Sequence, residues 1–469
     1  MRGAATVVLP PAVHEPLTPR GTAERCLESA RTSTTPGTGG LPEIRQWLEE
    51  RARVNEFTTT PVPFAQLDGW RFTDDTGDLV HRSGGFFRIR GLDVSGADGP
   101  VPHWSQPVID QPEVGVLGML AKEIDGVLCL LVQAKMEPGN INVLQLSPTV
   151  QATRSNFLRL HGGAATRYLE YFTEPGRGRV LADVLHSEQG GSFYRKRNRN
   201  IIVETDEDVV VHDDYRWVTV GQLHALLRED NMVNMDARTV LSCLPLSAPA
   251  AAFDDAAQSE TAAIQSWLNN AKSRSSLVSR LVPLASVDRW RRSEDAISHE
   301  ENRYFQVIGT MVRASNREVT SWGQPLIAPR GRGVVAFLVC RTRGDVEVLV
   351  HARAEGGTPD VVELGPTVQC VPDNFHGLPA GQQPRYLDLV REAAPGDILY
   401  DTLLSEEGGR FYQAENRYLA VGVDDEVRSS TPPPGFRWMA LRQLYALVRH
   451  GGYLNVEARS LLACLQPMV

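Results

Sequence analysis

The sequence predicts an α/β protein of the α+β type, made of two tandem copies of one domain in which helices flank a mixed sheet. Three observations indicate this fold class. A long polar segment occurs twice, each half contains apolar runs with the alternation of strands, and amphipathic helical segments lie on either side of those runs.

The repeated segment gives the size of the copy. Residues 185–199 read LHSEQGGSFYRKRNR and residues 403–417 read LLSEEGGRFYQAENR, with nine of the fifteen positions identical. The offset is 403 − 185 = 218 residues, and it also separates QLSPTVQ at 145–151 from ELGPTVQ at 363–369. Solenoid repeats are about 20–50 residues long, whereas 218 residues is the length of a domain. We therefore expect a duplicated domain and a polar site that is built twice.

Composition excludes several classes of protein. The net charge is −9 and the pI about 5.7, so the broad basic surface that non-specific nucleic-acid binding needs is missing. The six cysteines show neither C-x-x-C nor zinc spacing, which suits a reducing cytoplasm. The most apolar stretch, 115–134, is broken by Lys122, Glu123 and Asp125. We predict a cytoplasmic protein that binds no nucleic acid, no membrane and no metal.

The chain divides into four segments. Residues 1–40 are rich in Pro, Thr, Gly and Arg without a period, which predicts a mobile or surface-laid N-terminal extension. Residues 41–247 form the first repeat and residues 263–469 the second. The alanine-rich segment 248–262 between them reads as a linker.

Both repeats show the same order of elements. An amphipathic helix around Trp47 or Trp267 comes first, and an extended segment that ends at Gly91 or Gly309 follows. The next predicted elements are two strands within 114–135 or 334–353, a third strand with the L-x-P-T-V-Q motif, a helix from about 167 or 385, the S-E-x-G-G-x-F-Y block, a strand at 201–204 or 419–423, and a closing helix at 220–228 or 441–449.

Polar residues on the predicted strands form the first candidate set. Lys135 and Glu137, and then Gln145, Thr149 and Gln151, are spaced by multiples of two, which puts each group on one face of a strand. A solvated strand shows the same alternation. Retention of Gln and Thr in both copies, beside a proline that interrupts pairing, favours a binding face.

The S-E-x-G-G block is the second set. Adjacent glycines permit positive φ and close approach of a ligand, although a plain turn also uses them. In the first repeat the block leads into Arg195, Lys196, Arg197 and Arg199, a local basic cluster in an acidic protein. Guanidinium groups bind diphosphate oxygens in bidentate fashion, and a solvated strand edge is the alternative interpretation.

Two further features point to nucleotide binding or catalysis. Trp104 and Trp322 each begin a W-x-Q-P motif and are suited either to stacking on a base or to core packing. His161, in a glycine-rich loop after Asn156, is a candidate general base, because an unperturbed imidazole titrates near neutral pH.

The motifs LSPTVQAT, SEQGGSFYRKRNRN and SEEGGRFYQAENRYL resemble those of the NDP-hexose 2,3-dehydratases of antibiotic deoxysugar biosynthesis, over nearly the whole chain past residue 40. The resemblance implies a homodimeric lyase with two Nudix-like domains per subunit and one productive nucleotide-sugar pocket. It implies dTDP-4-keto-6-deoxy-D-glucose as substrate, no cofactor, and a downstream 3-ketoreductase as partner. Two rivals are a non-catalytic nucleotide-sugar binding protein and a metal-dependent nucleotide-sugar hydrolase.

The sequence departs from two patterns. Thr402-Leu403 stands where a Nudix box has Arg-Glu ahead of Glu406-Glu407, so the box for metal-dependent hydrolysis is broken. The second repeat has Glu355-Gly356-Gly357 where the first has Glu137-Pro138-Gly139. This difference, with the basic cluster, predicts that the first pocket is the productive one.

From the motifs and the resemblance we assign expected roles. The catalytic candidates are Tyr194, Glu188 and His161 as acid or base, and Lys135, with Gln151, for the enolate. The predicted substrate-binding residues are Trp104, Glu137, Gln145, Thr149, Gln151, Asn156, Arg167, Tyr168, Ser187, Gln189, Gly190, Gly191, Arg195, Arg197 and Arg199. The predicted residues of the second pocket are Trp322, Arg353, Glu363, Thr367, Gln369, Asn374, Arg385, Ser405, Glu406, Glu407, Gly408, Gly409, Tyr412, Asn416 and Arg417.

Overall fold

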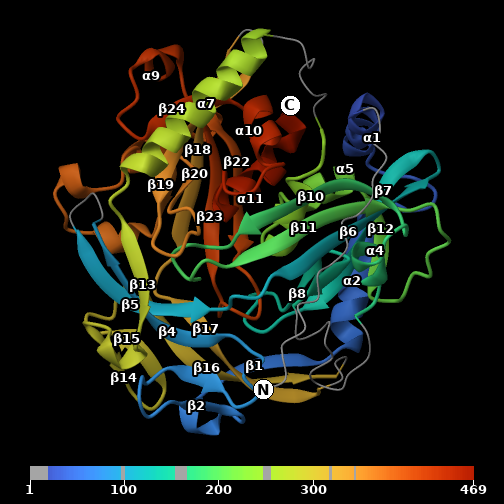
Figure 1. The fold of residues 1–469 in the computed structure, drawn as a ribbon. Coiled ribbons are helices and arrows are strands. Elements are labelled where there is room, and N and C mark those ends of the chain that lie inside the picture. The colour runs from blue at the N-terminus through green and yellow to red at the C-terminus, as the bar shows by residue number, and fades with distance from the viewer. Residues whose placement is uncertain are drawn as a thin grey trace.

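The computed structural model describes residues 19–96, 101–153, 166–246, 255–315, 319–342 and 345–468 (Figure 1). Each repeat contributes one seven-stranded mixed sheet, called here its large sheet, and most of one five-stranded sheet, called its small sheet. The predicted α+β class and the tandem duplication are confirmed. The two small sheets lie together below the two large sheets in Figure 1.

The large sheets share one topology. In the first, β11 runs parallel to β6, as β23 does to β18 in the second, and the other pairs are antiparallel. The first contains β6 (Gly115–Ile124), β7 (Val127–Met136), β8 (Leu144–Ser147), β9 (Val150–Ala152), β10 (Arg179–Ser187), β11 (Arg197–Glu204) and β12 (Tyr215–Thr219). The second contains β18 (Gly333–Arg341), β19 (Val346–Ala354), β20 (Val362–Gly365), β21 (Val368–Cys370), β22 (Ile398–Ser405), β23 (Glu415–Gly422) and β24 (Phe436–Ala440).

The small sheets exchange a strand between the repeats. The first contains β2 (Trp70–Phe72), β3 (Leu79–His81), β4 (Arg88–Ser95) and β5 (His103–Asp110), together with β13 (Val278–Val282) of the second repeat. The second contains β14 (Trp290–Arg292), β15 (Ala296–His299), β16 (Phe305–Ala314) and β17 (Ser321–Pro329), together with β1 (Phe57–Val62) of the first repeat. The repeats are therefore not the two self-contained domains that the predicted boundaries describe.

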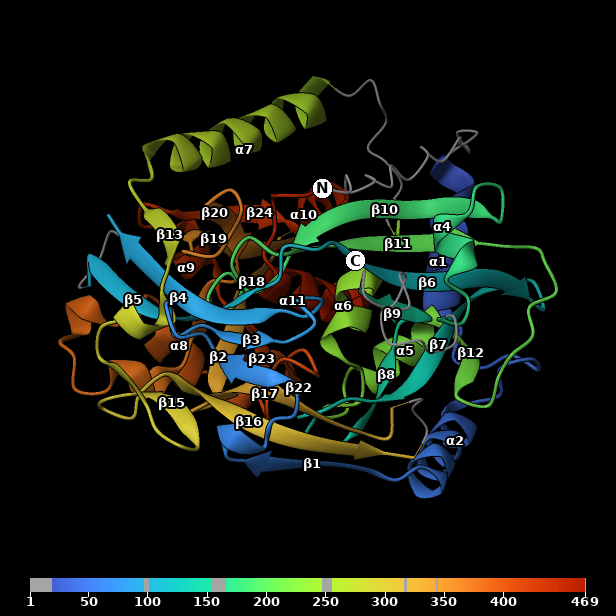
Figure 2. The same ribbon diagram turned by 60° about the horizontal axis from the view of Figure 1, so that its bottom comes forward.

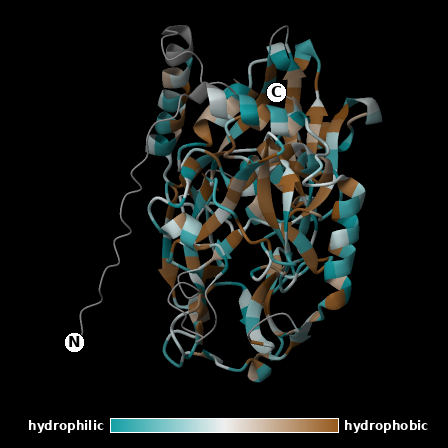
Figure 3. Cartoon of the chain, turned by 90° about the vertical axis from the view of Figure 1, so that its right-hand side faces the viewer, coloured by the Kyte–Doolittle hydropathy of each residue, from teal (hydrophilic) through white to brown (hydrophobic). Residues whose placement is uncertain are grey.

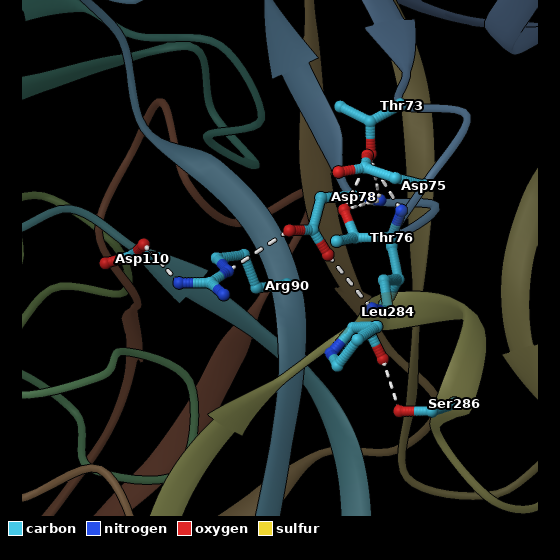
Figure 4. A network of polar contacts seen from close by, with 9 residues as sticks. Thr73, Asp75, Thr76, Asp78, Arg90, Asp110, Leu284 and Ser286 are labelled. Carbon is cyan, nitrogen blue, oxygen red and sulfur yellow. Dashed lines mark hydrogen bonds and ion pairs between the residues drawn. The ribbon is translucent and has the colours of Figure 1, made fainter.

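A polar network anchors this exchange (Figure 4). Asp78 accepts a hydrogen bond from the Leu284 amide at 2.9 Å, in the 3₁₀ turn η2 (Leu284–Ser286) of the second repeat. The same carboxylate binds the Arg90 guanidinium at 3.2 Å, and Arg90 also lies 3.5 Å from Asp110. Because Asp78 is buried, its hydrogen bond to the Leu284 amide of the other repeat is shielded from solvent, and Arg90 pairs its charge within the first repeat.

Helices cover the outer faces of the large sheets and fill the space between them (Figure 2). Their bounds are α1 (Pro19–Arg31), α2 (Leu41–Val54), α4 (Glu170–Thr173), α5 (Val220–Leu226), α6 (Met235–Leu241), α7 (Asp255–Arg274), α8 (Leu387–Arg391), α9 (Asp425–Ser429), α10 (Leu441–Leu447) and α11 (Val456–Leu465). The other described 3₁₀ turns are η1 (Phe64–Gln66), η3 (Pro372–Phe375), η4 (Ala380–Gln382), η5 (Pro395–Asp397) and η6 (Gln466–Met468).

The centre of the molecule is where α6 and α11 pack on each other. The last helix predicted for each repeat corresponds to α5 or α10. Helices α6 and α11 follow them in the chain and were not predicted. Each begins at an asparagine cap, Asn234 or Asn455, whose side chain accepts the amide hydrogen of the third helical residue. One continuous apolar core includes these helices and both large sheets, which fits the apolar interior strands of Figure 3.

Two segments outside the predicted repeats are partly helical. Residues from Pro19 to Arg31 form α1 rather than a surface-laid extension, and Ala23, Cys26 and Ser29 are buried in the core. The Ser29 hydroxyl donates to Leu128 O at 2.5 Å and accepts from Val220 N at 2.9 Å. The second half of the predicted linker is helical, because α7 begins at Asp255.

The L-x-P-T-V-Q motif is not one strand, as predicted, but two. The β6–β7 hairpin turns at Asp125-Gly126, with both φ angles positive, and its strands pair as far as Leu120 and Leu131. Beyond that point β6 pairs with β9 and β7 pairs with β8. The sheet therefore opens as a fork, and Thr149 lies at its base.

Candidate functional site

A cavity of about 890 Å³ lies over the fork of the first large sheet. Its walls come from both repeats: β6, β7 and β9 of the first, and the turn at 407–410 with the start of β17 from the second. Ligand pockets are commonly about 300–1,000 Å³, so this cavity has the size for a nucleotide sugar.

Three strand-borne side chains form a connected group in the cavity wall. Lys135 Nζ lies 3.1 Å from Glu137 Oε1 and donates to Gln151 Oε1 at 2.5 Å. Gln151 Nε2 donates to Glu137 Oε1 at 2.9 Å, and Asn234 Nδ2 donates to Glu137 Oε2 at 3.2 Å. The solvated-strand interpretation is wrong for Gln145 and Thr149, which are almost fully buried.

The glycine turn that faces this group belongs to the other repeat. The Gly409 amide donates to Pro138 O at 2.8 Å, and Gln413 N donates to Gly139 O at 2.6 Å. The reciprocal contacts join Gly357 N to Gly190 O at 2.8 Å and Arg195 N to Gly357 O at 2.6 Å. Each strand-borne group is thus completed by the S-E-x-G-G block of the other repeat.

Such close contacts explain two of the four glycines in the S-E-x-G-G blocks, Gly190 and Gly408. A Cβ at Gly190 would overlap Thr358 and Glu355, and one at Gly408 would overlap Glu137. Close packing between the repeats, rather than approach of a ligand, therefore requires glycine at these two positions.

The serines and the acidic residues before the glycines meet at the centre of the molecule. Ser187 Oγ donates to Glu363 Oε2 at 2.6 Å, Ser405 Oγ donates to Gln145 Oε1 at 2.8 Å, and Gln189 Nε2 donates to Glu406 Oε2 at 2.8 Å. The fully buried guanidinium groups of Arg238 and Arg459 donate to Ser405 O and Ser187 O at 2.8 Å and 2.6 Å. This network occurs once in each repeat and links the two repeats. None of its side chains lines the cavity over the fork.

The side chains of the basic cluster lie in different surroundings. Lys196 is buried, lines the cavity and donates to Glu113 O. Arg199 instead forms a bidentate pair with Asp183, at 2.8 Å and 2.6 Å. Arg197 lines a separate cavity of about 360 Å³, and Arg195 lies over the ring of Tyr194. Positive charge at the large cavity comes from Lys135, Lys196, Arg167 and Arg410.

The structure brings together residues that were predicted for different pockets. Those predicted for the first pocket that line the cavity are Lys135, Glu137, Thr149, Gln151 and Arg167. Those predicted for the second pocket that line the same cavity are Trp322, Glu407, Gly408 and Gly409. Asn156 and His161 lie outside the described residues.

Other predicted residues have structural surroundings. Trp104 and Tyr194 pack on the apolar cluster around Leu92 and Val94, away from the cavity. The hydroxyl of buried Tyr168 donates to Val210 O at 2.7 Å. Glu188 is buried and accepts from Asn198 Nδ2 at 2.7 Å without lining the cavity.

The second repeat repeats the strand-borne group with different chemistry. Arg353 Nε donates to Glu355 Oε1 at 2.7 Å, and Gln369 Nε2 donates to the same oxygen at 3.2 Å. Glu407 lies near the strand-borne group of the first repeat. The residue at the corresponding position near the group of the second repeat is Gln189, since the offset is 407 − 189 = 218. The smaller cavity is lined by Ser187, Arg197 and Glu363, but not by Arg353 or Gln369.

The remaining predicted residues of the second repeat also lie away from the large cavity. Thr367 is buried between β18 and β19, Tyr412 packs beside Ile308, and Asn416 donates to Glu406. Arg417 pairs with Asp401, Asn374 accepts from Arg303 through its carbonyl, and Arg385 is exposed.

Two carboxyl groups in the cavity wall have strongly perturbed pKa values. Burial, with the charges of Glu188 and Glu137, raises the pKa of Glu407 to about 7, against the opposing effect of Arg410 and Lys196. Burial also raises the pKa of Asp236 well above its ordinary value, and Glu407 adds to that shift. Burial lowers the pKa of Lys196.

Sequence reasoning missed Asp236, Arg410 and the cavity-lining Asn198. A signal for Asp236 was present, since Asn234-Met-Asp-Ala-Arg returns as Asn455-Val-Glu-Ala-Arg at an offset of 221. Within the described ranges no cluster of three or more His, Cys, Asp or Glu side chains has the arrangement of a metal site. Among the same residues no helix is long and apolar enough to cross a membrane.

Comparison with known proteins gives the family. The family described as NDP-hexose 2,3-dehydratase matches twice, at residues 41–244 and 261–465. A protein of Amycolatopsis orientalis named dTDP-4-dehydro-6-deoxy-alpha-D-glucopyranose 2,3-dehydratase is 51% identical over 90% of this chain and 89% of its own length. A protein of Streptomyces violaceoruber with the same name is 50% identical over 90% of this chain and 96% of its own length.

A third relative of that name, from Saccharopolyspora spinosa, is 49% identical over 91% of both chains. Proteins so named are hydro-lyases, which remove water from their substrate. The two family matches correspond to the two repeats and together cover most of the sequence. This chain belongs to the NDP-hexose 2,3-dehydratase family.

Proposed function

We propose that this protein removes water across C2 and C3 of dTDP-4-keto-6-deoxy-D-glucose, and that it does so in the cavity over the fork. The observation that carries the proposal is the composition of that cavity. It combines a carboxyl group with a pKa of about 7, a lysine held between a carboxylate and an amide, and further cations for a diphosphate. The names of the relatives support the choice of sugar nucleotide.

The chemistry needs a base before it needs an acid. The C4 ketone acidifies the C3–H bond, and a base removes that proton to give an enediolate. The C4 carbonyl re-forms, the C2–O bond breaks with its electron pair, and the hydroxyl leaves as water after it gains a proton. The C3 enol then tautomerises to a 3,4-diketo-2,6-dideoxy sugar, so C3 is oxidised as C2 is reduced within one molecule.

Glu407 is the proposed base. A carboxyl group with a pKa of about 7 is partly ionised at neutral pH and basic enough to accept a carbon-bound proton from an activated substrate. Gln189 at the corresponding position has an amide, which is not basic. This difference gives a chemical reason for the proposal that only the cavity completed by the second repeat is productive.

Cations and aromatic rings provide the proposed binding interactions. Lys135 is placed to stabilise the oxygen that becomes negative at C4, with Gln151 and Glu137 fixing its amino group. Arg167 and Arg410 are proposed to bind the diphosphate, and Trp322 the thymine.

Replacement of Glu407 by glutamine tests the proposal. With dTDP-4-keto-6-deoxyglucose as substrate and NMR detection of water loss, we expect Glu407→Gln to lower the rate about 10²–10⁴-fold. The matched control is Glu363→Gln, which replaces a buried carboxyl group of similar pKa by the residue that the first repeat has there. Wild-type rates in Glu407→Gln, or dTDP binding without any water loss by the wild type, would overturn it.

We also propose a cytoplasmic homodimer whose unstable product passes to a 3-ketoreductase. The six cysteines are free, and five are buried, which suits a reducing compartment. Light scattering of the purified protein tests the dimer, and a mass of about 52 kDa, that of one 51.7 kDa chain, would contradict it.

A further inference from the structure

Asp236 is a buried carboxyl group at the wall of the large cavity. It is the second residue of α6, whose start is fixed by the Asn234 side chain at 2.8 Å from Ala237 N. Only 2% of Asp236 is exposed, yet it lines the cavity together with Lys135, Glu137 and Glu407.

Asp236 has no hydrogen-bond partner among the residues that the structure describes, at either oxygen. Its neighbour Glu137 differs, because Lys135, Gln151 and Asn234 contact that carboxylate. An ionised carboxylate without partners is costly to bury, whereas a protonated one is much less so. The surroundings of Asp236 therefore hold a proton on it.

The neighbouring charges act in the same direction. The carboxylates of Glu407, Glu188 and Glu137 add to burial in raising the pKa of Asp236, and Lys135 opposes them. The cavity wall thus presents one carboxyl group with a pKa of about 7 and a second one, without partners among the described residues, whose ionised form is disfavoured by burial and by its neighbours. Two carboxyl groups with separated pKa values are the arrangement that acid–base catalysis needs.

We propose that Asp236 is the catalytic acid that gives its proton to the departing C2 hydroxyl of the sugar. The inference rests on the proposed dehydration and on Glu407 as its base. When the C2–O bond breaks, the Asp236 proton joins the leaving oxygen to form water and Asp236 becomes a carboxylate. The proton that Glu407 took from C3 balances it, and proton transfer back to Asp236 completes the cycle.

The second repeat supplies a matched position. Glu457 is the second residue of α11, is buried, and its Oε2 has no hydrogen-bond partner among the described residues. Burial raises its pKa as well. However, its repeat faces Gln189 instead of a basic carboxylate, so an acid is present there without a base.

The test separates removal of the C3 proton from loss of water. Substrate is incubated in D₂O with the wild type, Asp236→Asn, Glu457→Gln and Glu407→Gln. NMR and mass spectrometry then measure product formation and deuterium at C3 of recovered substrate. We expect Asp236→Asn to form product about 10²-fold more slowly or less while still exchanging the C3 hydrogen. Glu457→Gln should match the wild type in product formation, and Glu407→Gln should lose both reactions.

Several results would overturn the assignment. Product formation by Asp236→Asn at the wild-type rate would do so, as would loss of C3 exchange together with dehydration in a variant that still binds dTDP and melts like the wild type. If Asp236→Asn does not fold, Asp236→Glu decides, because the corresponding position of the second repeat holds a glutamate, Glu457. That variant should retain turnover, and its inactivity in a folded protein would contradict the role. No water loss by the wild type would instead refute the proposed function itself.

Discussion

At the residue scale, the two copies of the site differ most in chemistry at the position of Glu407 and Gln189. Glu407 and Gln189 follow the same Ser-Glu pair, but only the carboxyl group can exchange a proton near neutral pH. The copies also differ at Lys135 and Arg353, both of which pair with a glutamate two residues later. These differences in side-chain chemistry between two copies of the same backbone are the basis of the proposal that one cavity is productive.

The pKa of Glu407 predicts the pH profile. Glu188, Glu137, Arg410 and Lys196 surround this carboxyl group, and its pKa is about 7. A base works in its ionised form, so we expect kcat/KM to rise with pH through about 7. Steady-state kinetics across about pH 5 to 9 measure this rise. A rate that decreases with pH across 7 contradicts the assignment of the base.

Buried Glu363 predicts a pH-dependent change in stability. Burial raises its pKa from 4.5 to about 7, so the folded state holds a proton that the unfolded state releases. Stability from this group is complete below 4.5 and is lost as the pH rises to about 7. We expect Glu363→Gln to be more stable than the wild type at pH 8, by up to roughly 3 kcal/mol, and the gain to shrink at pH 5. Denaturant titrations at both pH values measure it, and a gain independent of pH contradicts it.

The sequence predicted many of these residues but not their partners. The offset of 218 pointed to Lys135, Glu137, Gln151, Trp322 and Glu407. It could not predict that Glu407 faces Lys135 of the other repeat, because that contact depends on tertiary packing. For the same reason Trp104 and Tyr194 looked equivalent to site residues, although they pack in an apolar cluster.

At the element scale, the fork in each large sheet depends on one threonine. The Thr149 hydroxyl accepts from Leu120 N at 2.8 Å and donates to Leu131 O. It replaces the ladder hydrogen bond at the point where β6 and β7 separate. Thr367 does the same between Leu338 N and Leu349 O. The threonine of the L-x-P-T-V-Q motif therefore holds the two strands of the hairpin apart. The alternation of side chains along a strand does not by itself predict this role.

Replacement of either threonine by valine should destabilise the protein. Each change leaves one buried amide and one buried carbonyl without their partner, and we expect a loss of roughly 2–4 kcal/mol. Equilibrium unfolding in urea measures the loss. The losses in the two variants should be similar, because each variant removes the equivalent pair of hydrogen bonds in its own repeat. A loss under about 0.5 kcal/mol in both would contradict the structural role of the hydroxyl.

Helix α1 shows why composition misled the prediction for residues 19–40. The segment has few large apolar residues, but small ones at Ala23, Cys26 and Ser29 let the helix lie close to β7 and α5. We expect Ser29→Ala to cost roughly 1–3 kcal/mol, because Val220 N loses a buried acceptor. Thermal melting of Ser29→Ala against Thr32→Ala, whose hydroxyl is bound to its own helix, measures it. Equal melting temperatures would contradict the anchoring role.

At the scale of the whole molecule, the repeats are interlocked. Strands β1 and β13 are exchanged, the glycine turns cross over, and one apolar core includes both large sheets. Sequence repetition predicted two domains because each copy contains a full set of elements. It could not predict exchange, since an exchanged strand and a retained strand have the same residues and differ only in the connection.

Interlocking predicts cooperative behaviour. We expect one unfolding transition by circular dichroism and by tryptophan fluorescence, with coincident midpoints. Residues 1–246 and 255–469 expressed separately should fail to fold, because each lacks one strand of its small sheet. Two separated transitions, or a stable isolated half, would contradict the interlocked architecture.

We propose that both repeats build one catalytic cavity, with the acid from α6, the base from the turn after β22 and the lysine from β7. A crystal structure of Glu407→Gln with dTDP-4-keto-6-deoxyglucose tests it most directly. The account predicts the C2–C3 edge of the sugar between position 407 and Asp236, with the C4 oxygen toward Lys135. A sugar bound instead between Gln189 and Arg353, in a variant that has lost activity, would contradict it.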